Sequence, residues 1–317
     1  MNFALELGLD IVRLLTVVAV GVMAGTLLEA TGVMKRVAYI SGPMLKLGKL
    51  SPVCGTAFVT AFASPRAANS MLASAYSEQS LSRRELISGA LVNLFPGSLT
   101  HLRVLAFVLI PLLGVAGVAY VLFQIITGFI CALTALIVSS LLAGGSKQST
   151  FAGTKNSGEE EQKKSLRDAL KEGWKRARKM LIRVICITVP IYVAVAVLEQ
   201  YGVFSSLTEY LPQSMTHILP PAGITVVAAH LSSVINAAGV ASELLGTGTL
   251  SSAQVFLTLV CGYVLSMPIR VMRHTIPAAV GIYPYREALL IVVAGQSLRL
   301  FFTLVCGTLI FVVMNGF

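Results

Sequence analysis

The chain has 317 residues, of which 56% are hydrophobic and only 12% are charged. A soluble domain carries about 25% charged residues, so this composition excludes a soluble globule and favours a membrane domain. The net charge of +10 does not indicate nucleic-acid binding, because about ten of the Lys and Arg residues lie within 147–179 and most others flank apolar segments.

The first part of the chain predicts one span followed by one interfacial helix. Residues 9–29 form an apolar run of about twenty residues, or ~30 Å of helix, which is long enough to cross a bilayer. Residues 33–50 mix Lys and Arg with Leu, Met, Val and Ile, a pattern typical of a helix that lies in the membrane interface.

A proline divides the next apolar segment, residues 51–78, at Ser64-Pro65. Each piece has about thirteen residues, or ~20 Å as helix, and is too short to span. Proline lacks an amide donor and disfavours helix at the preceding residue, so a sharp turn is expected. We therefore predict a re-entrant hairpin, which requires its tip to be buried in protein or to line a wet cavity.

Two further segments complete the first half. Residues 83–118 are apolar but interrupted around Pro96, which predicts one discontinuous span. Residues 120–143 are apolar without interruption and predict a full span. The linker after them, 145–179, contains a basic amphipathic segment whose positive charge predicts a cytoplasmic position against anionic lipid headgroups.

The same order of features returns in the second half. LEATGV at 28–33 matches LEQYGV at 198–203, Ser64 matches Ser233, and the interruption at Pro96 matches one at Pro268. The chain thus divides into a first membrane repeat (1–144), the cytoplasmic linker (145–179) and a second membrane repeat (180–317).

The charges predict that the two repeats have opposite orientations. Each repeat holds three crossings, an odd number, so the second must be inverted relative to the first. Residues 33–50 carry four Lys or Arg residues, whereas the equivalent residues 201–221 carry none, as expected for loops on opposite sides. Both chain termini are then expected outside, in a multi-pass protein of the cell membrane.

The predicted fold is an all-α polytopic membrane protein with two inverted-topology repeats, each with a re-entrant hairpin and a proline-broken helix. It has about six full spans and two hairpins, an arrangement found in many secondary transporters. The order of span, LExxGV, amphipathic segment, hairpin, broken helix and span resembles the nucleoside recognition (Gate) family. That family is related to concentrative nucleoside transporters, the gate of ferrous iron permeases and spore maturation membrane proteins, so the resemblance implies a transport scaffold.

Polar residues at the interruptions are the candidates for substrate binding, because polar groups inside spans are costly and usually functional. They are Ser64, Arg66, Asn69, Asn93, Ser98, His101, Arg103, Ser233, Asn236, Arg270, Arg273 and His274. Their arginines suit carboxylate or phosphate and no acidic residue accompanies them, so we expect a small anionic or nucleoside-like solute. The alternative is that these arginines cap broken helix ends or extend to the headgroups.

Other functions remain as alternatives. A metal-ion permease would use His101 and His274, although arginines lie beside both. A non-transporting scaffold is allowed by the spore maturation relatives. An enzyme is not expected, because no carboxylate pair lies in a membrane segment and no HExxH, GxSxG or P-loop motif is present.

The remaining expectations concern partners and single residues. The expected partners are the bilayer, the solute and, in a homo-oligomer, other copies of the chain, with no nucleic acid, cofactor or bound metal. The lone His230 is expected to be a packing residue, and Arg299 is expected to extend toward the headgroups.

Overall fold

The computed structural model describes residues 48–142 and 220–314, together with the single positions 12, 16, 20, 174 and 178. Several predictions about the sequence lie outside these residues: the span 9–29, most of the interfacial helix 33–50, the linker 145–179 and the LEQYGV match at 198–203. In the described residues the chain is helical and has no strand. Its two halves can therefore be compared from residue 48 and from residue 220 onward.

Four helical segments are long and apolar enough to cross a membrane: Arg83–Leu113, Val115–Leu141, Ser252–Arg270 and Tyr285–Val313. Large apolar side chains stay exposed along two of them, including Leu122 and Leu141 in the second and Phe301 and Leu309 in the fourth. Such a surface would aggregate in water and suits contact with lipid. The protein is therefore an all-helical membrane protein.

In the first half, two short helices precede the spans. They are α4 (Pro52–Ala61) and α5 (Pro65–Ser77), which pack against each other. Ser64 is extended and its Oγ accepts a hydrogen bond from Ala67 N, so it caps α5 at the predicted turn. The spans are α6 (Arg83–Val92) with α7 (Leu94–Leu113), and then α8 (Val115–Leu142).

The second half has the same order. The short helices α13 (Pro221–Ser232) and α14 (Val234–Gly246) pack against each other, and Ser233 caps α14. They precede α15 (Ser252–Arg270), a π-helical turn η2 (Val271–Thr275) and α16 (Ile276–Val280). The last helix is α17 (Tyr285–Met314).

The interruption in the first half lies just before Pro96, as its chemistry requires. Pro96 is the third residue of α7 and has no amide proton to donate to the carbonyl of Val92. The α6 helix accordingly ends at Val92, and Asn93 joins it to α7. The predicted single interrupted span is found, over Arg83–Leu113.

The match to Pro96 predicted an interruption at Pro268 in the second half. This prediction is wrong, because the interruption lies after Pro268. The α15 helix continues through Pro268 to Arg270, and the π-helical turn follows it. Pro277 lies directly after that turn, at the start of α16. Pro277 lacks the amide proton that an α-helix would direct to the carbonyl of residue 273, so widening of the preceding turn relieves the mismatch.

Three pairs of helix-start residues occupy equivalent places in the two halves. Pro52 and Pro221 open α4 and α13, and Ser64 and Ser233 cap α5 and α14. Ser82 and Ser251 form capping boxes at α6 and α15. Each pair differs by 169 positions, so the correspondence extends from the short helices into the spans.

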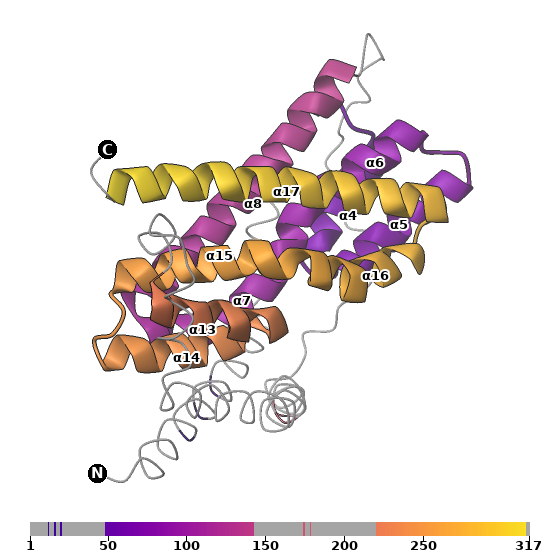
Figure 1. Ribbon diagram of the computed structural model, residues 1–317. Helices are drawn as coiled ribbons and strands as arrows, with labels where there is room; N and C mark the ends of the chain where they lie inside the picture. The colour runs from indigo at the N-terminus through magenta and orange to yellow at the C-terminus, as the bar shows by residue number, and fades with distance from the viewer. Residues whose placement is uncertain are drawn as a thin grey trace.

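The spans α6 and α15 begin at opposite ends of α17. Arg83 Nε donates to Glu287 Oε1 at 3.1 Å, so the first turns of α6 and α17 lie together. The start of α15 instead lies near the end of α17, because Ser252 and Leu309 line the same groove. In Figure 1 the α4–α5 and α13–α14 pairs accordingly lie toward opposite ends of α17.

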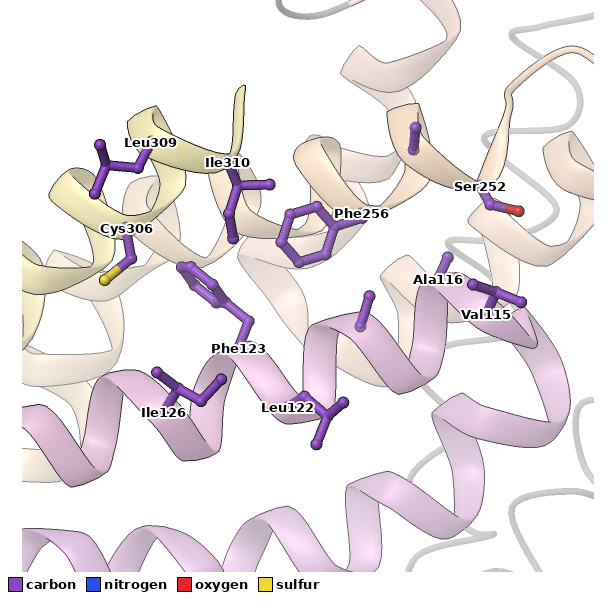
Figure 2. Close-up of a pocket in the computed structure, with 12 residues that line it drawn as sticks. Val115, Ala116, Leu122, Phe123, Ile126, Ser252, Phe256, Cys306, Leu309 and Ile310 are labelled. Atoms are coloured by element: carbon purple, nitrogen blue, oxygen red, sulfur yellow. The ribbon is translucent and has the colours of Figure 1, made fainter. Parts of the chain in front are cut away.

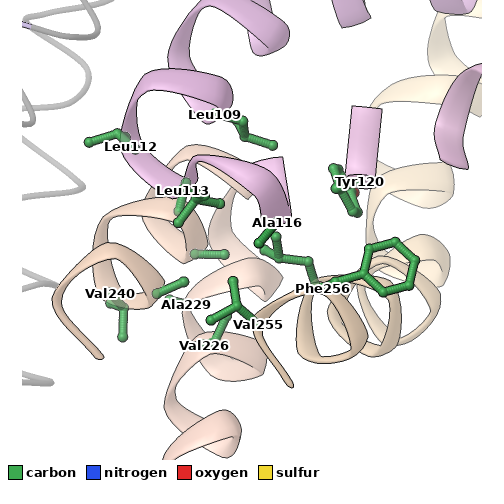
Figure 3. Packing of buried hydrophobic residues seen from close by; sticks show 14 of the residues in the cluster. Leu109, Leu112, Leu113, Ala116, Tyr120, Val226, Ala229, Val240, Val255 and Phe256 are labelled. Atoms are coloured by element: carbon green, nitrogen blue, oxygen red, sulfur yellow. The ribbon is translucent and has the colours of Figure 1, made fainter. Parts of the chain in front are cut away.

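Two apolar cores hold the ends of the molecule together. The first joins α13, α14 and the start of α15 to the end of α7 and the start of α8, and Figure 3 shows Leu113, Val226 and Val255 packed there. The second joins α4, α5 and α6 to the end of α8 and the start of α17, including Phe58, Leu86 and Ile291. The middle of α8 and the middle of α17 lie between the two cores.

Candidate functional site

Between the two apolar cores lies a chain of polar contacts that links four elements. We call it the central polar cluster; its members are Ser98 of α7, His230 of α13, Tyr263, Ser266 and Arg270 of α15, and Arg299 of α17. Arg299 is the fifteenth of the 30 residues of α17, so about 20 Å of helix lies on either side of it. The cluster is therefore at mid-depth along the longest described helix.

Tyr263 is the centre of this cluster, because two arginines from different helices face its ring. The guanidinium carbon of Arg270 lies 4.4 Å from the ring centroid, and that of Arg299 lies 5.7 Å away. Tyr263 is itself buried. Both distances fall within the range of cation–π attraction, so both cations are held at the same ring.

Neutral groups supply the hydrogen bonds of the two arginines. Arg299 Nη1 donates to Ser98 Oγ at 2.7 Å, which ties α17 to α7. Arg270 Nη2 donates to the carbonyl of Tyr263 at 3.2 Å and to Ser266 Oγ at 3.4 Å. None of these contacts neutralises the positive charge of either guanidinium.

The described carboxylates are all near helix ends, away from these contacts. Glu78 follows α5, Glu85 and Glu287 are in the first turns of α6 and α17, and Glu243 is near the end of α14. Glu287 pairs with Arg83 in the first turn of α17, twelve residues or ~18 Å of helix before Arg299. Arg270 and Arg299 thus have no carboxylate partner among the described residues.

Several buried polar atoms in the middle of the molecule have no hydrogen-bond partner within the described residues. They are Asn93 Oδ1, Gln124 Oε1, His230 Nε2, Arg299 Nε and Thr303 Oγ1. Such atoms are uncommon in native proteins, since leaving one unpaired costs about 1–3 kcal/mol. Each provides an unused donor or acceptor for a polar ligand or for water.

The structure brings several of the predicted first-half residues together near the α5–α7 contact. Asn93 Nδ2 donates to Asn69 Oδ1 at 3.4 Å, which joins the α6–α7 junction to α5. The α4–α5 turn approaches α7 as well, because a Cβ added at Gly97 would lie 3.6 Å from Pro65 Cβ. Ser64 acts as a helix cap there, so its side chain has a structural role.

The predicted basic residues of the first half lie close to one another. The charges of Arg299, Arg103 and Arg66 all act on His101, so these four side chains form one basic region. Arg66 and His101 are exposed, whereas Arg103 is half-buried. A divalent cation at His101 would meet three positive charges, which argues against metal binding there.

The predicted second-half residues differ in their positions. Arg270 belongs to the central polar cluster, and Ser233 caps α14 by accepting from Asn236 N at 3.1 Å. The side-chain amide of Asn236 donates to Ser232 Oγ, next to that cap. His274 is exposed in the π-helical turn, and the side chain of Arg273 lies outside the described residues.

Three cluster members differ from the sequence-based interpretation or were missed by it. Arg299 does not extend toward the headgroups, because its guanidinium turns inward to Ser98. His230 is buried as predicted for a packing residue, but it also contacts Ser266 through Nδ1 at 3.2 Å. The sequence interpretation did not include Tyr263. The arginine seven residues after it and the arginine in the last apolar span were the features that could have pointed to it.

Another feature, the lateral groove, is apolar and separate from the cluster. It has a volume of about 650 Å³ and lies between the start of α8, the start of α15 and the end of α17, as Figure 2 shows for Val115, Phe256 and Leu309. Ser252 is the one hydroxyl-bearing residue among those that line it. This lining offers no charge for an anion, so the groove is not the candidate solute site.

The chain is similar to three proteins of Methanocaldococcus jannaschii. Uncharacterized protein MJ0871 is 26% identical over 91% of this chain and 89% of its own length. Uncharacterized protein MJ1556 is 25% identical over 90% of this chain and 89% of its own, and uncharacterized protein MJ0880 is 22% identical over 86% and 88%. No family model and no solved structure matches the chain. The similarity to these relatives extends over both halves.

Proposed function

We propose that the protein is a secondary-transporter-like carrier that binds a small anionic solute at the central polar cluster. The observation that carries this proposal is the pair Arg270 and Arg299, which face one tyrosine ring without a carboxylate partner in the described residues. Two cations at one buried ring at mid-depth repel each other and are costly in hydrocarbon. An anionic ligand offsets both costs.

The proposed architecture is a pair of inverted-topology repeats. Two observations support it. Equivalent residues start the helices of the two halves at an offset of 169, and α6 and α15 begin at opposite ends of α17. In this arrangement α4–α5 and α13–α14 are re-entrant hairpins whose tips approach the middle from opposite sides. Contacts of Pro65 with α7 and of His230 with α15 favour that interpretation.

The proposed orientation follows the basic residues. Arg83, Arg84 and Arg286 gather at one end of the spans, and the Arg83–Glu287 ion pair lies there. We assign that end to the cytoplasm of a cell-membrane protein, with the linker 145–179 on the same side. The start of α15, which has no nearby Lys or Arg between 244 and 254, is then outside.

A thermal-shift panel in detergent tests the anion site. Sulfate, phosphate, organic acids, nucleotides, nucleosides and divalent metals are compared with matched neutral compounds. We expect anions to stabilise the wild-type protein, and we expect Arg270→Gln and Arg299→Gln to lower the affinity at least about tenfold, as for loss of a charged hydrogen bond.

Arg286→Gln is the matched control, since it removes one exposed arginine at the start of α17 and should retain the anion response. Stabilisation by nucleosides instead of anions would favour the nucleoside-like solute. A metal response that depends on His101 would favour the metal-ion permease, and no response to any solute would favour a scaffold.

A further inference from the structure

His230 is a buried histidine that is connected to Arg270 through a single hydroxyl group. Its side chain is 3% exposed, and its Nδ1 lies 3.2 Å from Ser266 Oγ. Arg270 Nη2 donates to the same Oγ at 3.4 Å. A titratable imidazole is thus linked through one hydroxyl to the proposed anion site.

The contacts of Ser266 indicate which nitrogen of His230 carries a proton. Ser266 Oγ has a third contact at 3.1 Å, in which it donates to the carbonyl of Tyr263. A hydroxyl has one proton to donate, so all three contacts are hydrogen bonds only if His230 Nδ1 donates to Ser266 Oγ. His230 Nε2 is then an unprotonated acceptor.

His230 Nε2 is buried and has no hydrogen-bond partner among the described residues. The fit around the ring is close, since a Cβ added at Gly262 of α15 would lie 2.8 Å from both Cβ and Cγ of His230. Gly262 therefore allows α13 and α15 to approach and holds the imidazole beside Ser266. A proton bound at Nε2 would lie within protein and close to the arginine site.

The ionisable groups on the helices packed against α13 define the electrostatics of His230. Two helices pack against α13. The ionisable residues of α15 are Cys261, Tyr263 and Arg270, and that of α14 is Glu243, near the end of the helix. Within the described residues, Arg270 is the charged group whose field acts on the imidazole. The positive charge of Arg270 opposes a second positive charge on His230.

We propose that His230 Nε2 binds a proton together with the anion, so that the carrier couples anion movement to a proton; this inference rests on the proposed anion site. An anion at Arg270 offsets the field that opposes protonation of His230. A protonated His230 in turn adds positive charge that strengthens anion binding. Thermodynamic linkage requires both effects to have the same factor, which we expect to be about tenfold.

Sulfate binding measured by calorimetry in detergent between pH 4 and 7 tests the inference. Sulfate remains a dianion in this range, so any pH dependence belongs to the protein. We expect affinity to rise about fivefold toward the acidic end, with an uptake of up to about half a proton per sulfate where the dependence is steepest, because a tenfold linkage factor allows no more. Measurements in two buffers with different ionisation enthalpies give that proton count.

Three variants separate the proton site from the anion site. His230→Gln should bind sulfate without the pH dependence, whereas Arg270→Gln should lose sulfate binding at every pH. His274→Gln is the matched histidine control, because His274 is exposed in the π-helical turn, outside the central polar cluster, and should leave the dependence unchanged. If His230→Gln does not fold, Ser266→Ala keeps the imidazole, breaks its link to Arg270 and should reduce the dependence.

The outcomes are distinguishable. Sulfate binding that is independent of pH in the wild type, or a dependence that is lost in His274→Gln and kept in His230→Gln, overturns the proton site and leaves the anion site standing. Absence of sulfate binding to the wild type at every pH overturns both proposals.

Discussion

The ring of Tyr263 faces two guanidinium groups, and we expect this aromatic face to stabilise the fold. Arg270 and Arg299 lie 4.4 and 5.7 Å from the ring centroid. Tyr263→Leu should lower the free energy of unfolding by about 1–2 kcal/mol, because leucine offers no negative ring face to the two cations. Tyr263→Phe keeps the ring and should resemble the wild type when thermal unfolding is followed in detergent.

Equal melting temperatures for the Leu and Phe variants would contradict this role of the ring. They would show that the two arginines are held by their hydrogen bonds to Ser98 and Ser266 without help from Tyr263.

Gly262 allows the contact between α15 and His230, and we expect it to tolerate no side chain. An added Cβ would lie 2.8 Å from His230 Cβ, which the helices can relieve only by moving apart. Gly262→Ala should therefore destabilise the protein by about 1–3 kcal/mol in thermal unfolding. Gly246→Ala, where no atom lies within 4 Å of the added Cβ, is the control and should be close to neutral.

At the scale of residues, sequence reasoning could identify polar groups near helix interruptions but not which of them meet. Ser98 and Arg270 were predicted and belong to the central polar cluster. Tyr263 and Gln124 read as ordinary members of apolar spans, because hydropathy does not tell which face of a buried helix meets another helix. Arg299 was assigned to the headgroups for the same reason.

The capping boxes at Ser82 and Ser251 offer a test of the correspondence between elements. In each, the serine Oγ accepts from the backbone amide three residues later, and that residue's side chain accepts from the serine amide. Ser82→Ala and Ser251→Ala should each cost about 1 kcal/mol of stability, and the costs should add because the two sites lie in different halves.

Ser82→Thr and Ser251→Thr are the matched controls, since threonine also caps helices and should preserve most of the stability. A cost at one box and none at the other would argue against equivalent roles for α6 and α15.

Helix boundaries could be predicted from proline chemistry only in part. The interruption before Pro96 was found where the missing amide proton requires it, at Asn93. The second interruption lies after Pro268, because a proline near a helix end can be accommodated while Pro277 disturbs the next turn. The positions of Pro268 and Pro277 in the sequence do not show which of the two prolines distorts the helix.

For the whole molecule, the proposed opposite orientation of the two halves predicts which loops are accessible from each side of the membrane. Ser80 and Thr249 are exposed, lie at equivalent loop positions and differ by the same 169 positions as the helix starts. In a cysteine-free background, we expect a membrane-impermeant maleimide to label Thr249→Cys in intact cells. Ser80→Cys should react only after the cells are permeabilised.

Labelling of both positions from the same side would contradict the inverted repeats. Arg286→Cys, at the start of α17, is a control for the cytoplasmic side. We assign it to the same side as Ser80, so it should also react only after permeabilisation.

The central claim is that an anion crosses the membrane through the site formed by Arg270 and Arg299. Its most direct test is uptake, into proteoliposomes, of the anion that stabilises the protein most in the thermal-shift panel. We expect saturable uptake by the wild type and by Arg286→Gln, and little above protein-free vesicles for Arg270→Gln and Arg299→Gln. Saturable uptake that both cluster variants retain, or none by the wild type, would contradict the account.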